Sequence, residues 1–318
     1  MASDSPSVPS ESRWVTTVLG PISADEIGRC DAHTHVWIDP VEGSLPGSPV
    51  LNEYPAILAE LQEYRQLGGS AIVDCQPGGC GRNGLILARL ARESGVHILA
   101  ATGFHRTRYY PHNYWLWKAT ANEACAYFLG EIQVSLTETR ALEMPVKACF
   151  IKVACEATLK ETPRHSLEGA VAAAVQSGAA IEVHTERGAD VEAILRCFLD
   201  SGVPANKLVL CHMDKRPDIG LHQELASSGV LLEYDTFFRP KYNPDEHVWP
   251  LIEAMIDAGY ERRLALATDI AELGMWQHQG GPGLFGFLTI ICQRLKAIGL
   301  SDAQLDLLLG KNIIRQLI

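Results

Sequence analysis

From residue 28 onward, short apolar segments alternate with longer stretches of helical spacing, and this alternation constrains the fold more than any other feature of the sequence. It is typical of βα units arranged around a parallel sheet. Eight such units are enough to close the sheet into a barrel. We predict eight strands, at residues 30–35, 70–74, 97–103, 148–152, 180–184, 208–212, 230–234 and 264–269. The predicted fold is therefore α/β, a single-domain (β/α)8 (TIM) barrel.

The stretches between the strands are rich in Ala and Leu, and their apolar residues recur at helical spacing. The clearest of them cover residues 54–67, 167–177, 190–201, 221–228 and 248–258. A glycine follows each one, as expected where a helix ends in a left-handed residue: Gly68, Gly178, Gly202, Gly229 and Gly259. The last helix is predicted to begin at Ser301, because Gln304 completes a capping box three residues later.

The sequence contains no recognisable second domain or internal repeat, so residues 15–318 are predicted to form the one barrel. Residues 1–14 are rich in Ser and Pro, and we expect a flexible tail there. This segment lacks the basic start and the apolar centre of a secretory signal. No apolar run approaches the roughly 20 residues that span a bilayer.

The formal net charge of −11 disfavours two classes of partner. Nucleic-acid backbones and anionic membrane surfaces repel an acidic protein, so we expect a small-molecule substrate instead. Nine cysteines without a CxxC pair do not indicate a disulfide framework. The cytoplasm, a reducing compartment, is therefore the expected location.

Polar residues stand at the ends of several predicted strands, where a barrel carries its chemistry. The first strand ends in His33-Thr-His35. Residues two apart on a strand point to the same side, so both imidazoles can converge on one cation. The alternative for an isolated pair of this kind is two surface or capping histidines. Partners from other strands are needed to decide between them.

Three further strands supply such partners. His184 and His212 each end an apolar run, and each taken alone is compatible with an ordinary buried histidine. Asp269 closes the eighth strand, where a buried carboxylate is costly unless a cation or hydrogen bonds compensate. Taken together, the three residues favour a metal site.

Lys152 lies inside the apolar segment Cys149-Phe-Ile-Lys-Val-Ala154. Burial penalises the ammonium form, and a neutral amine can add carbon dioxide. The resulting carbamate has two oxygens, which can bridge two cations. The alternative is a lysine paired with an acidic neighbour such as Glu156 or Glu182. The five other potential ligands on the remaining strands favour the bridging role.

Two cations held in this way would share a hydroxide that is nucleophilic at neutral pH. Imidazole and carboxylate ligands suit Zn or Mn, and also Fe or Co, better than Mg or Ca. The expected cofactors are therefore two divalent metal ions, with carbon dioxide bound as the carbamate of Lys152.

Several motifs resemble the phosphotriesterase-like family of the amidohydrolase superfamily, over nearly the whole chain. The likeness runs from Thr17-Val-Leu-Gly-Pro-Ile22 through His33-Thr-His35, Val73-Asp74 with Gly79-Cys-Gly-Arg82, Phe150-Ile-Lys152, His184-Thr-Glu186, Cys211-His-Met-Asp214 and Thr268-Asp269. One departure is Thr34, where many relatives have Glu. Its side chain should point away from the metals.

The resemblance implies a role for each ligand. His33, His35 and Asp269 would bind the more buried ion, and His184 and His212 the more exposed one. Carboxylated Lys152 would bridge the two ions, and Asp269 would also take the proton of the attacking hydroxide. Glu186 and Asp214 would orient these ligands. Relatives are often dimers, so a homodimer is expected.

The substrate must be decided by the loops, because the family divides mainly between lactone and organophosphate hydrolysis. Arg239, Lys241 and Tyr242 follow the seventh strand, where a barrel commonly binds phosphate. With Gly280-Gly-Pro-Gly283, this loop resembles the subgroup that acts on sugar lactones, including phosphorylated ones. The alternative is a solvated basic loop. His105, after the third strand, could touch the leaving group or simply pack in its loop.

The leading hypothesis is a hydrolase that opens a sugar lactone, or a phosphorylated one, to a hydroxy acid. The alternative is a phosphotriesterase or a promiscuous esterase that uses the same site. A non-catalytic barrel that binds a ligand is disfavoured, because a degenerate relative should lack at least one metal ligand.

Overall fold

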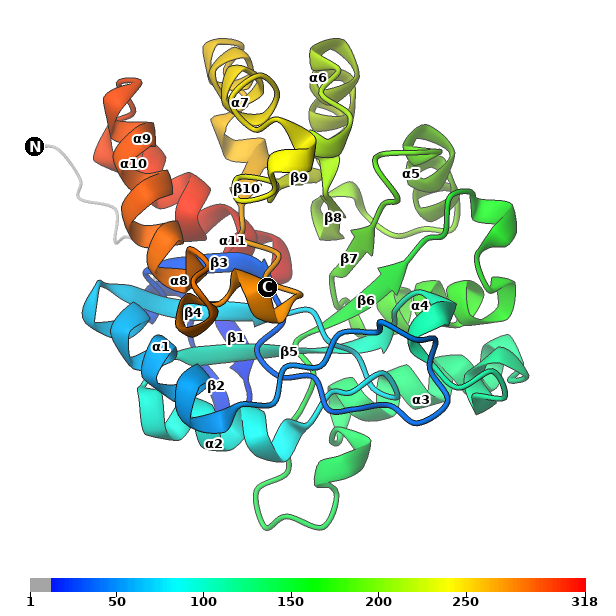
Figure 1. Cartoon of the computed structure of the whole chain (residues 1–318). Helices are drawn as coiled ribbons and strands as arrows, with labels where there is room; N and C mark the ends of the chain where they lie inside the picture. Colours follow the sequence, from blue (N-terminus) through cyan, green and yellow to red (C-terminus); the bar gives the residue numbers. More distant parts are fainter. Residues whose placement is uncertain (1–12) are drawn as a thin grey trace, which may run out of the picture.

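The computed structural model describes residues 13–318, and eight parallel strands form their centre, surrounded by helices (Figure 1). Each strand pairs with the next along the chain, from β3 through to β10. Two backbone hydrogen bonds join the ends of this sheet, from Asp269 to His33 (2.8 Å) and from His35 to Ile270 (3.1 Å). The predicted (β/α)8 barrel is therefore confirmed. Its strands are β3 (Arg29–Thr34), β4 (Gly69–Asp74), β5 (His97–Phe104), β6 (Phe150–Ala154), β7 (Ile181–His184), β8 (Leu208–Cys211), β9 (Leu231–Tyr234) and β10 (Leu264–Leu266).

The five helices predicted from spacing are present, with each end within three residues of the prediction. The structure contains α2 and α3 in addition to these five. All five predicted terminal glycines have positive φ, and Ser301 and Gln304 form the predicted capping box. Among the described residues, no helix is both long and apolar enough to cross a membrane. The helices are α1 (Tyr54–Gln66), α2 (Gly84–Ser94), α3 (Ala121–Gln133), α4 (Arg164–Ser177), α5 (Val191–Asp200), α6 (Ile219–Ser227), α7 (Val248–Asp257), α8 (Gly283–Gly286), α9 (Cys292–Ala297), α10 (Asp302–Asp306) and α11 (Asn312–Leu317).

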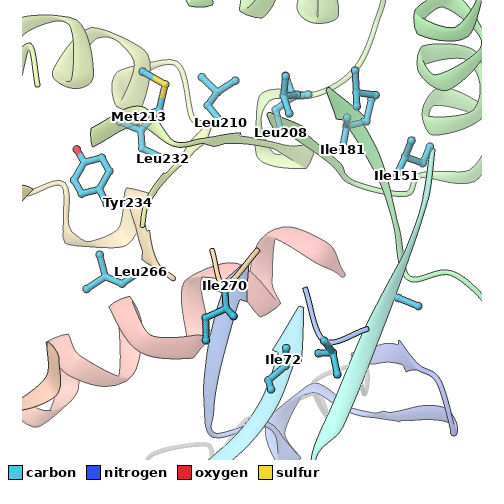
Figure 2. Close-up of a cluster of buried hydrophobic side chains, with 14 of the residues drawn as sticks. Ile72, Ile151, Ile181, Leu208, Leu210, Met213, Leu232, Tyr234, Leu266 and Ile270 are labelled. Carbon is cyan, nitrogen blue, oxygen red and sulfur yellow. The ribbon is translucent and has the colours of Figure 1, made fainter. Parts of the chain in front are cut away.

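Two layers of apolar side chains hold the barrel together. The outer layer lies between strands and helices, and Figure 2 shows members of it contributed by β4 and by β6 through β10. The inner layer fills the barrel with small side chains such as Ala32, Ala71, Ala101 and Ala265. Small residues leave room for the larger polar side chains that share the barrel interior.

The end of the barrel at which the strands begin, called the lower end below, is closed by elements from both ends of the described chain. An antiparallel hairpin, β1 (Trp14–Thr17) and β2 (Gly20–Ser23), was not predicted from the sequence. Val15 of this hairpin belongs to the inner apolar layer, as do Ile313 and Leu317 of α11. Of the tail predicted at residues 1–14, Trp14 is the first residue of β1, and residues 1–12 lie outside the described part of the chain.

A buried histidine links α6 to the barrel, and we predict that it makes folding sensitive to acid. His222 is bonded to the Tyr234 hydroxyl (2.6 Å) and the Arg216 carbonyl (2.9 Å). Burial lowers the pKa of His222 to about 4, whereas an unfolded chain protonates near pH 6.5. The unfolded state therefore binds more protons between these values, so stability falls as the pH drops from 6.5 to 4, by up to about 3 kcal/mol from this residue.

Urea unfolding at several pH values measures this contribution. In the His222→Asn variant, the loss of stability between pH 6.5 and pH 4 should be shallower than in the unmodified protein. Equal slopes for the two proteins would contradict the assignment.

Candidate metal centre

His33 of β3 and His35, which directly follows this strand, are both aimed at the barrel mouth by hydrogen bonds at their Nδ1 atoms. His33 Nδ1 lies 2.7 Å from Glu233 Oε1, and His35 Nδ1 lies 2.6 Å from Gln76 Oε1. An imidazole that donates through Nδ1 keeps a free lone pair on Nε2. Both Nε2 atoms face Asp269, whose Oδ1 lies 3.8 Å from His33 and 3.9 Å from His35.

His212 comes directly after β8, and Asp269 comes shortly after the end of β10. Both residues have a left-handed backbone. Their φ values are 63° and 45°, a region that residues other than glycine rarely occupy. Backbone strain of this kind is concentrated at functional positions. A carboxylate that directly follows β9 fixes the ring of His212, because Asp235 Oδ2 lies 2.5 Å from its Nδ1. The sharp turns thus direct both side chains across the mouth.

All six predicted ligands meet at this mouth. Lys152 Nζ lies 3.2 Å from His33 Nε2. The ring centroid of His212 lies 4.9 Å from that of His33 and 4.6 Å from that of His184. Asp269 Oδ2 lies 3.8 Å from His212 Nδ1. Side chains from five different strands and strand ends therefore surround one small volume.

Burial sets the protonation of these histidines. It lowers the pKa of His35 to about 4, lowers that of His33 and His212 well below the usual value, and lowers that of His184. Burial raises the pKa of Asp269, but the nearby Arg239 and other cations outweigh it and the net direction is downward. Neutral imidazoles and an ionised carboxylate are the forms that bind metal ions.

The residues present fit a pair of divalent cations. His33, His35 and Asp269 offer ligand atoms within 4.8 Å of one another. His184 Nε2 is buried, and its acidic neighbour Glu186 lies 3.5 Å away without well-aligned hydrogen-bond geometry, so this nitrogen can take a better partner. A cation between His184 and His212 would supply it. Two other groups are equally close, His33, His212, Glu233 and Asp235, and His33, Glu182, Cys211 and Glu233, but in both of them Glu233 already bonds His33, and in the first Asp235 already bonds His212.

Lys152 is fully buried near Glu182, one of the two acidic neighbours considered in the sequence, and near Glu233, which was not considered there. Burial lowers the pKa of Lys152, but Cys211, Cys75, Glu182 and Glu233 raise it by more, opposite to the direction expected from burial alone. Burial also raises the pKa of Glu182, against the pull of the Lys152 charge.

The predicted substrate residues lie in different surroundings. His105 is almost buried, with its ring centroid 5.5 Å from that of His184. Arg239 is bonded to Asp269 Oδ2 (2.9 Å), so its charge is already neutralised. Lys241 is exposed and lies over the ring of Tyr242, with Nζ 5.2 Å from the ring centroid. The structure places the three residues of this loop together, but only Arg239 contacts a predicted metal ligand directly.

A cavity of about 270 Å³ opens beside His35 and His105. Its wall is largely the loop between β3 and α1, which in Figure 1 runs from β3 across this face of the barrel. This loop packs against the segment after β5, where Leu45 N donates to the Arg108 carbonyl (3.1 Å). A substrate in this cavity would lie next to the ligands of β3.

Several residues of the site were missed in the sequence. Glu233 and Asp235 stand two apart on β9 and its end, the same spacing that drew attention to His33 and His35. Lys215, 3.9 Å from both Asp235 and Asp269, follows the His212 motif. The spacing on β9 could have revealed the first two, whereas nothing local marks Lys215.

Comparison with known proteins agrees with this geometry. The sequence profile of the Phosphotriesterase family matches residues 13–317. The chain belongs to the phosphotriesterase family. It is therefore a hydrolase of a family that depends on metal ions, and the resemblance drawn from its motifs is confirmed.

Individual relatives have diverged widely from this member of the phosphotriesterase family. A phospho-furanose lactonase of Mycoplasmopsis synoviae is 26% identical, over 94% of this chain and 90% of its own. An N-acetyltaurine hydrolase of Salmo salar is 26% identical, over 94% and 96%. The crystal structure of a lactonase from Listeria monocytogenes superimposes with a TM-score of 0.88 at 20% identity, over 96% and 99%. The last of these likenesses establishes the fold alone.

Proposed function

We propose that this protein hydrolyses lactones at a centre of two divalent cations. The observation that carries the proposal is the meeting of six potential ligands at the barrel mouth, beside a cavity that can hold a substrate. Relatives named for lactone hydrolysis, one of them for phospho-furanose lactones, support the choice of ester. The phosphotriesterase alternative has no comparable support among these names.

His33, His35 and Asp269 would hold one cation, and His184 and His212 the other. Lys152 would bridge them as a carbamate, since its Nζ lies inside the barrel, 3.2 Å from His33 Nε2. Zn or Mn suits this mixture of imidazole and carboxylate ligands. When bound, the cations supply the positive charge that lowers the pKa of the attacking water and polarises the carbonyl of the substrate.

Asp269 would act as the proton carrier of the reaction. Its lowered pKa keeps it ionised at neutral pH, so it can accept the proton of the attacking water. The water oxygen bonds to the carbonyl carbon, the ring C–O bond breaks, and the ring oxygen takes a proton to leave as a hydroxyl. Arg239 holds the second carboxylate oxygen of Asp269 and keeps the side chain oriented. The product is a hydroxy acid.

A substrate panel tests the proposal. Purified protein loaded with Zn or Mn is assayed with a pH indicator against furanose-type and other lactones and an organophosphate triester, and by detection of the released amine against N-acetyltaurine. We expect hydrolysis of lactones to be at least about tenfold faster, in kcat/KM, than that of the other two classes. Turnover of the triester or the amide above that of every lactone would overturn the proposal.

Removal of the metal gives a second test. Dialysis against a chelator should lower activity more than about a hundredfold, because the charge that activates water is lost. Zn or Mn should restore it, and the restored protein should contain about two ions per chain by elemental analysis. Activity that survives complete metal removal would contradict the role of the six ligands.

The cellular location and assembly are also proposals. We propose a cytoplasmic protein, and its nine cysteines, all free, support a reducing compartment. The homodimer implied by the family resemblance stays a prediction, which sedimentation analysis can check.

A further inference from the structure

We propose that the cavity beside His35 binds an uncharged, apolar substituent on the substrate ring, and not a phosphate or a chain of hydroxyl groups. This inference rests on the proposed lactone hydrolysis and narrows its substrate class. It also separates this protein from the relative named for phosphorylated furanose lactones.

The wall of the cavity is predominantly apolar. The loop between β3 and α1 contributes Ile38, Pro40, Val41, Pro49 and Val50, together with other side chains of the same segment. His35 and His105 line the opposite side, so the cavity is continuous with the candidate metal centre. A ring whose carbonyl faces the metal ligands would therefore place a substituent against these apolar side chains.

The serine and glutamine side chains of the wall are satisfied within the protein, which leaves the Tyr109 hydroxyl and His105 Nε2 as the polar side-chain atoms that could meet a substituent. The hydroxyl of Ser44 donates to the Val41 carbonyl (2.9 Å), and that of Ser48 donates to the Leu45 carbonyl (2.7 Å). Gln76 bonds His35 through its oxygen and the Cys80 carbonyl through its nitrogen. A hydroxylated substituent would lose its bonds to water and gain few in return, which is unfavourable.

No lysine or arginine lines the cavity within residues 13–318. Three cations close to the site are engaged by carboxylates: Arg239 by Asp269, Arg106 by Glu156 and Glu186, and Lys215 by Asp235 and Asp269. Lys241 and Arg108 are exposed outside the cavity wall. A phosphate placed here would be desolvated without a partner.

The entrance repeats the same chemistry. A second hollow of about 440 Å³ shares Pro49, Val50, Tyr109 and Ala271 with the cavity and extends to Glu272 and Leu273. The acidic group that this hollow adds is Glu272, whose carboxylate lies 3.5 Å from Arg239 and shares that cation with Asp269, so no cation is left free there to attract an anion. The volume of 270 Å³ lies just below the usual range for sites of drug-sized ligands, so a short substituent fits best.

The test compares γ-lactones that differ only in the ring substituent: methyl, butyl, hydroxymethyl and phosphomethyl. The metal-loaded protein should show a kcat/KM at least about tenfold higher for the butyl than for the methyl compound, since each buried methylene is worth up to about fourfold. The phosphomethyl compound should be the slowest. Faster turnover of the phosphomethyl or hydroxymethyl lactone than of the butyl lactone would overturn the inference.

Two variants of the wall sharpen the comparison. Val41→Arg places a cation in the cavity and should lower the butyl to phosphomethyl ratio at least about tenfold, whereas the milder Val41→Ala should lower only the preference for butyl over methyl. Val134→Arg makes the same change at a side chain that is 65% exposed and away from the cavity, and should leave both ratios unchanged. An unchanged ratio in Val41→Arg, in a variant with normal melting behaviour, would also overturn the inference.

A binding measurement separates this inference from the proposed function. Calorimetry with the γ-butyl lactam, which keeps the ring and substituent but replaces the ester, should give tighter binding than with the γ-methyl lactam, and Val41→Arg should remove the difference. If no lactone is hydrolysed but the two lactams still bind with different affinities, lactone hydrolysis is wrong and the apolar cavity is supported. If all the lactones are hydrolysed equally well and the two lactams bind equally, only the assignment of the cavity is wrong.

Discussion

Replacement of Lys152 by alanine should lower kcat/KM for lactones by more than about a thousandfold, because the variant lacks the group that would join the two cations. Nζ of this residue lies 3.2 Å from His33, in the middle of the predicted ligands. Added short carboxylic acids such as acetate or propionate should restore part of the activity by occupying the vacated space. Steady-state kinetics and metal analysis measure both effects.

A matched control distinguishes the role of Lys152 from general damage. Lys207 is a half-buried lysine on the opposite side of the chain's fold, where its Nζ donates to the Ile318 carbonyl (2.7 Å). Lys207→Ala should keep activity within about threefold, as expected of a substitution outside a functional site. Near-normal activity in Lys152→Ala, or rescue that is equal in both variants, would exclude the bridging role.

The Asp269→Asn variant should lose more than about a thousandfold in kcat, because the amide cannot accept the proton of the attacking water. The substitution keeps the size of the side chain but removes the charge that pairs with Arg239. The guanidinium then loses its nearer carboxylate and keeps only the more distant Glu272 (3.5 Å), so a loss of stability of up to about 3 kcal/mol is also expected. Kinetics and urea unfolding report the two effects separately.

Asp245→Asn is the corresponding control, because it removes the partner of Arg294 in an exposed ion pair. Such pairs contribute about 1 kcal/mol or less, and kcat should not change. If Asp269→Asn lost stability but kept kcat, its carboxylate would be structural and the proton would have another acceptor.

The elements that could be predicted from the sequence are those defined by local spacing. Each barrel strand was predicted because its apolar run is short and bounded, and His33 and His35 share a face because they stand two apart. The five glycines that end helices were predictable for the same reason, since positive φ is a local requirement. The predicted metal ligands followed from the expectation that strand ends meet at one mouth of a barrel.

The features that could not be predicted depend on contacts between distant segments. The pairing of Arg239 with Asp269 joins residues 30 apart, and it changes a presumed anion-binding arginine into one that positions a carboxylate. Of the acidic neighbours that raise the pKa of Lys152, Glu182 was considered from the sequence, but Glu233, from β9, was not. The apolar cavity depends on how the loop after β3 folds back over the mouth, which no short motif encodes.

The floor of the barrel has a consequence for the catalytic cycle. Because Val15 and the residues of α11 fill the lower end, the interior has no exit on that side within the described chain. Whatever enters past Glu272 and Leu273 must leave the same way. A ring ester would enter neutral and depart as an anion, so the acidic rim that tolerates the first would expel the second. Salt screens the repulsion between the acidic rim and the anionic product, so release of product should become faster as the salt concentration falls.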